Sequence, residues 1–542
     1  MIIKNKLLLI FILIGCFLHF YNLNWGYPFY FHPDERNIAS SVSQLQFPDK
    51  MNPNFFAYGS LPIYAIYFTG VIFNFLTNNL PIQNVLFENA LLISRFYSAF
   101  FATLLIPILF LLGKKLKDEK TGLFASFFAL TSVGFIQYSH FGTFEMWLTF
   151  FSTLLFWVCL QKVTHKTILL AGIIFGTLVA VKISSLILLP IPILILISQT
   201  KLPRNMIFKL GGLLAISNFV KNTILIILTS GLVYFLTNPF VITDYDSFRG
   251  SMDYESSLVI GTLPVFYTGE FFNTTPMLFH FLNIYPFLIN PLITILFIVS
   301  SIYILFITIK KKNLSYYLLF STCYLLFLSQ AFFFAKWTRY IVPTLPFIFL
   351  IVGIFLSDFL QFLKKSSLMK YLILTIVILT GILFSISFFI TTFVREDTRI
   401  AASEFAAKNI PSQSRILSEV YDMGIVPFNS SLPNIKLFNF YDLDNNSPES
   451  TPDSLKFNLE TSDYIILPSQ RLLKTRLLNG DKFPIGNEFY KNLVDGKLNY
   501  KKIYETPCDI FCKIVYLGDP VFSFEQTANV FDRPQILIFK KI

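Results

Sequence analysis

The chain has 542 residues, of which 54% are hydrophobic, 18% are aromatic and only 14% are charged. A soluble domain carries about 25% charged residues, so this composition excludes an ordinary soluble protein. Many apolar runs reach the roughly 20 residues that a helix needs to cross a bilayer, which indicates a polytopic integral membrane protein. The net charge of +11 does not indicate nucleic-acid binding, because the lysines cluster in short loops, as is typical of cytoplasmic connections.

The first apolar run, residues 7–20, follows Lys4 and Lys6 and lacks a small-residue cleavage site. It is therefore predicted to be a retained span rather than a signal peptide. Basic residues in later loops set the orientation of the chain, with the amino terminus inside and a first external loop at about residues 21–89. These loop residues are Lys114, Lys115, Lys117, Lys120, Lys201, Arg204, Lys209, Lys310, Lys311, Lys312, Lys364 and Lys365.

The apolar stretch 61–76 lies inside this first external loop. A full crossing there would place Lys114 and Lys115 outside, and the stretch is short and contains Tyr64 and Asn74. It is therefore predicted to lie at the membrane interface or to dip partway into it. With that assignment, residues 1–394 form a transmembrane domain of about eleven helices.

The composition changes from residue 395 onward. Residues 399–409 have helical spacing, and the runs 464–467 and 535–539 are typical of strands. Residues 395–542 are therefore predicted to form a soluble α/β domain outside the membrane. In an extracytoplasmic domain Cys508 and Cys512 could form a disulfide, and two free thiols are the alternative.

Adjacent carboxylates at Asp34 and Glu35 follow the first span. An acid pair so close to a membrane exit is costly unless it has a function, and the alternative is a pair of solvated loop charges or a helix cap. Glu145 is predicted to lie at the outer mouth of a tight turn between two spans, where it could instead simply favour the helix dipole. Two acids at one membrane face suit a general base for an acceptor hydroxyl and a group that holds the acceptor or a cation.

Two histidines lie beside these acids. His32 and His140 could ligate a divalent metal. Because they show no firm spacing motif, hydrogen bonding is their expected role. No cofactor is therefore predicted, and a divalent cation is left open.

Three cations are predicted at the same face as the acids. Arg95 lies four residues into the second span, Lys182 ends a span and Arg339 precedes one. Each alone could extend to the interface. Together they suit a lipid-linked phosphate, whose developing charge they would stabilise during group transfer. No Gly-rich phosphate loop follows a predicted strand, so a nucleotide-sugar donor is not favoured.

Several segments, in this order along the chain, are similar to motifs of one known family. They are His32 to Glu35, residues 54–62, residues 95–99, Thr275 and Pro276 with Leu282 and Asn283, Arg339 and Tyr340 with Pro343 and Pro346, and residues 531–534. Together they resemble the GT-C-fold, polyprenyl-phosphate-sugar-dependent glycosyltransferases of the protein O-mannosyltransferase and aminoarabinose lipid A transferase superfamily. The resemblance covers most of the chain.

The resemblance implies that Asp34 is the catalytic base, supported by Glu35. Glu145 matches the position of a second acid, which in relatives is usually Asp. Lys182 and Arg339 become candidates for the lipid phosphate. The implied reaction is sugar transfer from a polyprenyl monophosphate carrier to a hydroxyl, usually with inversion. The tail does not match the β-trefoil insert of the eukaryotic protein mannosyltransferases, so a protein acceptor is not implied.

Our first hypothesis is therefore a membrane glycosyltransferase whose active site and C-terminal domain are extracytoplasmic. Arg95, Tyr58 and His140 join Lys182 and Arg339 as predicted substrate-binding residues. The alternative is a transporter or flippase of a lipid-linked sugar, which would place its charges in a midplane cavity. The sugar, and an acceptor that is a lipid, a glycan or a protein, stay open.

Overall fold

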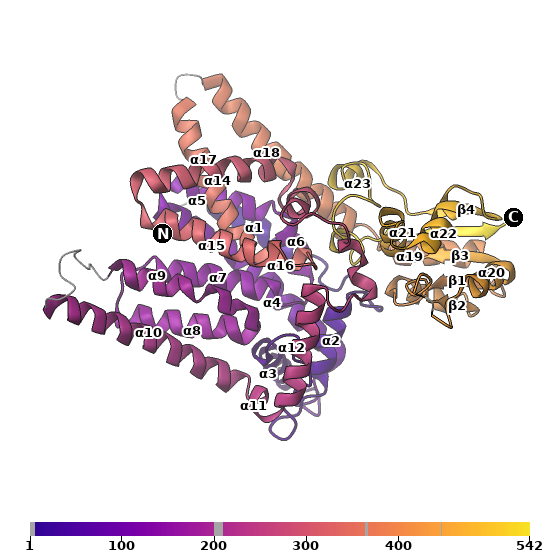
Figure 1. Ribbon diagram of the computed structural model, residues 1–542, viewed down its shortest axis with the longest axis horizontal. Coiled ribbons are helices and arrows are strands. Elements are labelled where there is room, and N and C mark those ends of the chain that lie inside the picture. The colour runs from indigo at the N-terminus through magenta and orange to yellow at the C-terminus, as the bar shows by residue number, and fades with distance from the viewer. Residues whose placement is uncertain (1–5, 200–209, 364–366, 446) are drawn as a thin grey trace.

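The computed structural model describes residues 6–199, 210–363, 367–445 and 447–542. The orienting residues Lys4, Lys201, Arg204, Lys209, Lys364 and Lys365 lie outside these ranges. The described chain divides into a helical body and a smaller α/β unit, which lies beside the body along the long axis of the molecule (Figure 1).

Apolar helices build the body. They are α1 (Lys6–Phe20), α4 (Phe87–Leu116), α5 (Glu119–Leu130), α6 (Val133–His140), α7 (Glu145–Cys159), α8 (His165–Val181), α9 (Pro190–Gln199), α10 (Leu210–Thr237), α14 (Pro291–Lys311), α15 (Leu314–Ala331), α17 (Leu345–Phe362) and α18 (Ser367–Phe389). Within the described ranges, six helical segments are long and apolar enough to cross a membrane, and α5 with α6, bent by 51°, makes a seventh if they form one broken span. The protein is an integral membrane protein, and the count of eleven spans stays a prediction.

Helix α17 is the centre of the body. The continuous segment Thr338–Phe362, formed by α16 (Thr338–Ile341), a 3-10 turn and α17, has 89% of its most apolar window buried. Helices α5, α14, α15 and α7 pack around it. Its burial distinguishes it from the apolar segment Ile216–Thr237, where only 17% of the corresponding window is buried.

Shorter elements gather at the end of the body near the α/β unit. Helices α2 (Pro33–Ser43) and α3 (Ser60–Leu76) lie in the predicted first external loop. Helix α12 (Tyr245–Ile260) follows α10 and lies near them (Figure 1). The amide of Asn52 donates to Asp244 at 2.8 Å, which joins the loop before α3 to the start of α12.

Five strands form the sheet of the α/β unit, in the order β2-β1-β3-β5-β4. Strands β1 (Ile416–Glu419), β2 (Ile435–Phe438) and β3 (Tyr464–Leu467) are parallel, whereas β5 (Leu537–Lys541) runs antiparallel to β3 and β4 (Tyr500–Glu505). The surrounding helices are α19 (Thr398–Asn409), α20 (Pro452–Thr461), α21 (Arg471–Leu478), α22 (Pro484–Val494) and α23 (Ile510–Val515). The predicted helix at 399–409 is α19 and the predicted strand at 464–467 is β3.

The last predicted strand, 535–539, starts two residues later in the structure. Gln535 and Ile536 precede β5, and the Ile536 amide donates to the Thr506 hydroxyl at 2.9 Å rather than to the neighbouring strand. Both faces of the sheet are buried, with Leu417 and Ile465 in one apolar cluster and Ile416 and Ile466 in another. Burial on both faces explains why the central strand β3 is continuously apolar.

The two cysteines of the α/β unit are bonded. Cys508 and Cys512 form a disulfide with their Cα atoms 5.2 Å apart. Between them, Asp509 caps α23 by accepting from the Cys512 amide at 3.1 Å and pairs with Arg395. This turn therefore fastens the start of the α/β unit just after the last apolar helix.

Buried polar groups join the α/β unit to the body. Glu525 accepts from the hydroxyl of Thr338 at 2.6 Å, directly before Arg339. Glu270 pairs with Lys474 at 2.5 Å, and both side chains are almost fully buried. These contacts fix the start of the α16–α17 segment against the α/β unit.

Glu525 should make this junction sensitive to pH. Its burial, with the carboxylate of Glu270 nearby, raises the pKa of Glu525 from 4.5 to about 7. A carboxyl group whose pKa is raised in the folded state stabilises the fold when protonated, so its contribution is complete below pH 4.5 and is lost as the pH rises through 7. We expect the melting temperature of the purified protein to fall between about pH 5 and about pH 8, and to fall less in Glu525→Gln.

The exposed Glu488→Gln on α22 is the control and should keep the wild-type slope. Burial also raises the pKa values of Asp532 and Glu419, to about 7 and about 8. Because both residues are present in all three proteins, they contribute equally to the change of melting temperature with pH in each. Identical slopes in Glu525→Gln and the wild type would contradict this account of the junction.

Candidate active site

Two cavities adjoin at the end of the body near the α/β unit. The larger has a volume of about 610 Å³ and is lined by both parts of the chain. The smaller has about 270 Å³ and lies between helices of the body. Five residues line both cavities and form what we call the shared wall: Ala57, Glu145, Lys182, Glu255 and Arg339.

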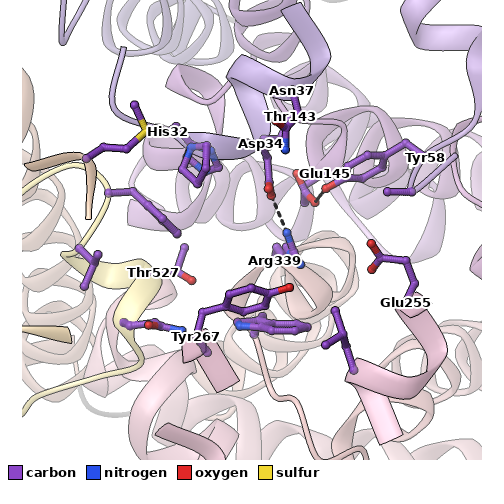
Figure 2. Close-up of a pocket in the computed structure, with 18 of the residues that line it drawn as sticks. His32, Asp34, Asn37, Tyr58, Thr143, Glu145, Glu255, Tyr267, Arg339 and Thr527 are labelled. Carbon is purple, nitrogen blue, oxygen red and sulfur yellow. Dashed lines mark hydrogen bonds and ion pairs between the residues drawn. The ribbon is translucent and has the colours of Figure 1, made fainter. Parts of the chain in front are cut away.

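Asp34 points into the larger cavity. Pro33 takes the first position of α2, where its fixed backbone angle favours the helix start, and Asp34 follows it. One carboxylate oxygen of Asp34 lies 2.5 Å from a terminal nitrogen of Arg339 (Figure 2). The two side chains are 28% and 24% exposed, so both reach the space that a substrate would fill.

Glu35 faces the opposite way and is fully buried. Arg95 donates to its two oxygens at 3.1 and 2.6 Å, and the amide of Gly142 donates at 2.5 Å. The remaining contacts of Arg95 go to the backbone oxygens of Leu23 and Trp25 at 2.8 and 2.9 Å. Arg95 therefore does not line either cavity, contrary to its predicted role toward a lipid phosphate. Its guanidinium donates its hydrogen bonds to Glu35 and to backbone oxygens of the first external loop.

The close contact between the α6–α7 turn and α4 leaves no room for a side chain at Gly142. A Cβ atom on Gly142 would lie 2.1 Å from the hydroxyl oxygen of Ser94. The turn between α6 and α7 can therefore approach α4 closely only with glycine at this position. That approach brings the Gly142 amide to Glu35 and sets the start of α7, where Glu145 lies.

Glu145 is the second acid of the cavity. It is 1% exposed and begins α7. One of its oxygens accepts from the hydroxyl of Tyr58 at 3.3 Å, and the other has no hydrogen-bond partner in the described structure. Burial, with Glu145 beside it, raises the pKa of Tyr58 well above its usual value, so Tyr58 stays a hydrogen-bond donor. The predicted grouping of Asp34 and Glu145 is what the structure shows (Figure 2).

Lys182 closes the same wall from α8. Its ammonium lies 5.1 Å from the ring centre of Tyr58 and 4.8 Å from that of Tyr340. No carboxylate of the described chain forms an ion pair with it. A Cβ on Gly59 would lie 1.8 Å from the backbone oxygen of Ala180, so only glycine lets the loop of Tyr58 rest on the end of α8.

The histidines differ in their placement. His32 lines the larger cavity between the rings of Phe141 and Phe531, each 4.6 Å away, and burial lowers its pKa, which favours the neutral imidazole. His140 lies outside the cavity, contrary to its predicted role in substrate binding. Its two ring nitrogens lie 2.7 Å from the backbone oxygens of Ile136 and Tyr21, so it is a packing residue.

Sequence reasoning did not single out several residues of the site. Glu255 on α12 lies on the shared wall, and burial raises its pKa. Nothing distinguished it from its neighbour Asp253 in the same external loop. Arg399, Asp422 and Arg471 of the α/β unit also line the larger cavity. The segments that contain these three residues show no local sequence pattern that would predict a contact with the cavity of Asp34.

Comparisons with known proteins agree with this architecture. Residues 80–239 match the family model described as dolichyl-phosphate-mannose-protein mannosyltransferase. The oligosaccharyltransferase of Archaeoglobus fulgidus in the apo form superposes with a TM-score of 0.51 at 11% identity, over 99% of this chain and 88% of that one. The chain therefore shares the fold of this oligosaccharyltransferase. A helical membrane fold of the predicted kind is shown, whereas the count of about eleven spans and the soluble C-terminal domain stay predictions.

Two further structures resemble this chain. The A. fulgidus protein AglB in complex with an inhibitory peptide and a dolichol-phosphate gives a TM-score of 0.50 at 12% identity, over 99% of this chain and 88% of that one. ArnT from Cupriavidus metallidurans bound to undecaprenyl phosphate gives 0.45 at 10% identity, over 98% and 97%. No sequence among curated proteins matches significantly.

The buried pair of Glu35 and Arg95 should behave as a structural element. Arg95→Met leaves Glu35 buried without its partner, which costs about 3–5 kcal/mol in comparable pairs. We expect a large loss of melting temperature in this variant, and a partial recovery in the double variant Glu35→Gln/Arg95→Met, because neither charge then remains. Wild-type stability of Arg95→Met together with weaker binding of polyprenyl phosphate would instead restore the predicted phosphate role.

Proposed function

We propose that this enzyme transfers a sugar from a polyprenyl-phosphate carrier to an acceptor hydroxyl at the outer face of the membrane. The observation that carries the proposal is the shared wall, where Lys182 and Arg339 stand beside the acids Asp34 and Glu145. The name of the matching family and the dolichol-phosphate in the complex of AglB support a lipid-borne donor.

The smaller cavity suits the lipid end of such a donor. Apart from the shared wall, its lining is largely apolar and comes from α7, α8 and α15 and the turns beside them, including Leu148, Leu178, Leu326, Phe333 and Pro343. Prenyl units are apolar, so burying them there is favourable. The phosphate would then lie at the shared wall, where Lys182 has no ion pair and the Nε of Arg339 has no hydrogen-bond partner among the described residues.

The chemistry follows from this placement. Asp34 takes the proton of the acceptor hydroxyl as its oxygen attacks the anomeric carbon. The bond from that carbon to the phosphate oxygen breaks, and its electron pair leaves with the phosphate. Lys182 and Arg339 stabilise the charge that develops there. Attack on the face opposite the leaving group inverts the anomeric configuration.

Glu145 would hold the sugar. Its second oxygen is free, and Tyr58 fixes the first, so it can accept from a sugar hydroxyl without moving. A divalent cation is a weaker fit, because the described residues bring no group of three His, Cys, Asp or Glu side chains together, although one structure of AglB holds zinc and sulfate. Lys182 and Arg339 supply the positive charge instead.

The position of the charges favours transfer over transport. Asp34 and Glu145 begin helices α2 and α7, Lys182 follows the end of α8, and Arg339 lies in the first turn of its helix. All four meet at the end of the body that faces the α/β unit. A flippase would need such charges in a midplane cavity. With this end outside, residues 395–542 form the extracytoplasmic domain.

Replacing Asp34 tests the mechanism. Asp34→Asn keeps an oxygen for Arg339 but removes the base, so we expect transfer to fall about 100- to 10,000-fold with unchanged melting temperature. The assay follows release of polyprenyl phosphate from a panel of synthetic polyprenyl-phosphate sugars by the purified protein. The control is Asp49→Asn, an exposed acid of the same external segment. Full activity of Asp34→Asn would rule out its role as base.

Replacing Lys182 tests the phosphate site. A hydrogen bond to a charged group contributes about 1.5–3 kcal/mol, so Lys182→Met should weaken binding of polyprenyl phosphate about 10- to 100-fold. Binding of the lipid phosphate to purified protein measures this, with Lys310→Met at an exposed helix end as the control. Equal affinities in all three proteins would place the phosphate elsewhere.

A further inference from the structure

The parallel strands of the α/β unit direct one edge of the sheet at the larger cavity. Strands β1, β2 and β3 run in the same direction, so their carboxyl ends meet at one edge. In open α/β sheets this is the edge at which ligands bind. The segments that follow β1 and β3 supply Tyr421, Asp422, Gly424 and Arg471 to the lining of the cavity that also contains Asp34.

An aromatic platform forms part of this edge. Phe266, from the 3-10 helix η3 (Phe266–Phe271), stacks on Tyr421 with ring centres 4.8 Å apart and an interplanar angle of 19°. It also meets Tyr441, which follows β2, at 4.9 Å. Tyr421 is 57% exposed although its backbone has a φ of +64°. A large side chain held in the left-handed region costs about 1–3 kcal/mol. The packing of the exposed Tyr421 ring does not explain why this cost is tolerated.

Polar groups border the platform with their geometry already set. The carboxylate of Asp422 accepts from the Ser469 hydroxyl at 2.5 Å and from the Gly424 amide at 2.8 Å. Arg471 packs over Phe531 at 5.6 Å, and its Nε is buried without a hydrogen-bond partner in the described structure. The hydroxyl of Tyr441 interacts with Arg471. Asp422 and Arg471 line the cavity as a held acceptor and a donor, so this edge suits a ligand whose polar groups can pair with both.

We propose that this edge is the acceptor subsite and that it binds a sugar ring, so that the acceptor of this enzyme is a glycan. A sugar ring has an apolar face for the ring of Tyr421 and hydroxyls that both donate and accept. Asp422 accepts from such hydroxyls and Arg471 donates to them. The inference rests on the proposed function, because a hydroxyl of the bound glycan must reach Asp34 in order to accept the sugar.

The charges of the edge do not favour a phosphorylated acceptor. Asp422 and Arg471 carry opposite charges, so together they offer no net positive charge to a phosphate. The larger cavity, at about 610 Å³, has the size of sites that enclose small ligands. It therefore has room for a short stretch of glycan between the edge and the shared wall.

Two substitutions at the edge test the inference on the full-length protein. Tyr421→Asn removes the ring but suits the left-handed backbone. Arg471→Met removes the donor and keeps much of the apolar stem. The matched control is Arg415→Met, which removes an exposed arginine just before β1, at the opposite edge of the sheet. Melting temperatures establish that all four proteins are folded.

The measurement is binding of a panel of neutral oligosaccharides, with a panel of Ser- and Thr-containing peptides as a second arm. We expect at least one oligosaccharide to bind, and its affinity to fall about tenfold or more in both edge variants but not in Arg415→Met. Oligosaccharide binding that ignores the edge variants, its absence, or peptide binding that the edge variants abolish would each overturn the sugar assignment.

Carrier release in the absence of acceptor separates this inference from the proposed function. When water replaces the acceptor, carrier release requires Asp34 and the shared wall but not the edge. Both edge variants should therefore keep carrier release while losing transfer to the oligosaccharide. Retained Asp34-dependent release with transfer unaffected by the edge variants would refute the subsite alone. No release from any donor by the folded wild type would refute the proposed function itself.

Discussion

The active site depends on one buried ion pair, Glu35 with Arg95. Arg95 comes from α4, Glu35 from α2, and the Gly142 amide that completes the contact comes from the turn before α7. The pair therefore fixes three elements relative to one another. Two of them carry the acids of the cavity, Asp34 and Glu145. Breaking the pair would leave a charge buried in an apolar surrounding, so the arrangement resists distortion.

The α/β unit helps to position Arg339 and lines the larger cavity together with the helices. Glu525 holds Thr338, the neighbour of Arg339, so the cation that meets Asp34 is positioned from the α/β unit as well as from its own helix. The helices supply the charges and the apolar cavity, whereas the sheet edge supplies aromatic and polar groups opposite them. Under the proposed function, such a division would place the lipid donor and a water-soluble acceptor on different sides of one reacting centre.

The sequence was sufficient for a helical membrane fold and for the main charges of the site. Charges near apolar spans are rare, so Asp34, Glu145, Lys182 and Arg339 stood out, and the structure brings all four together. The same signal misassigned Arg95, because a buried structural pair and a ligand-binding cation look alike in one sequence. Glu255 and Arg471 could not be found, since acids in loops are common and the contact between sheet edge and cavity joins segments far apart in the chain.

The neighbouring acids Asp34 and Glu35 show how one local pattern serves two purposes. Consecutive residues on a helix point in directions about 100° apart, so a single turn of α2 sends one carboxylate to the cavity and the other to the core. Asp34 keeps 28% of its side chain exposed and forms an ion pair with Arg339, whereas Glu35 is fully buried and both of its oxygens accept from fixed donors. Glu35 lines neither cavity, so it is out of reach of a substrate there. The role proposed for Asp34 thus depends on Glu35, which holds the helix that presents Asp34.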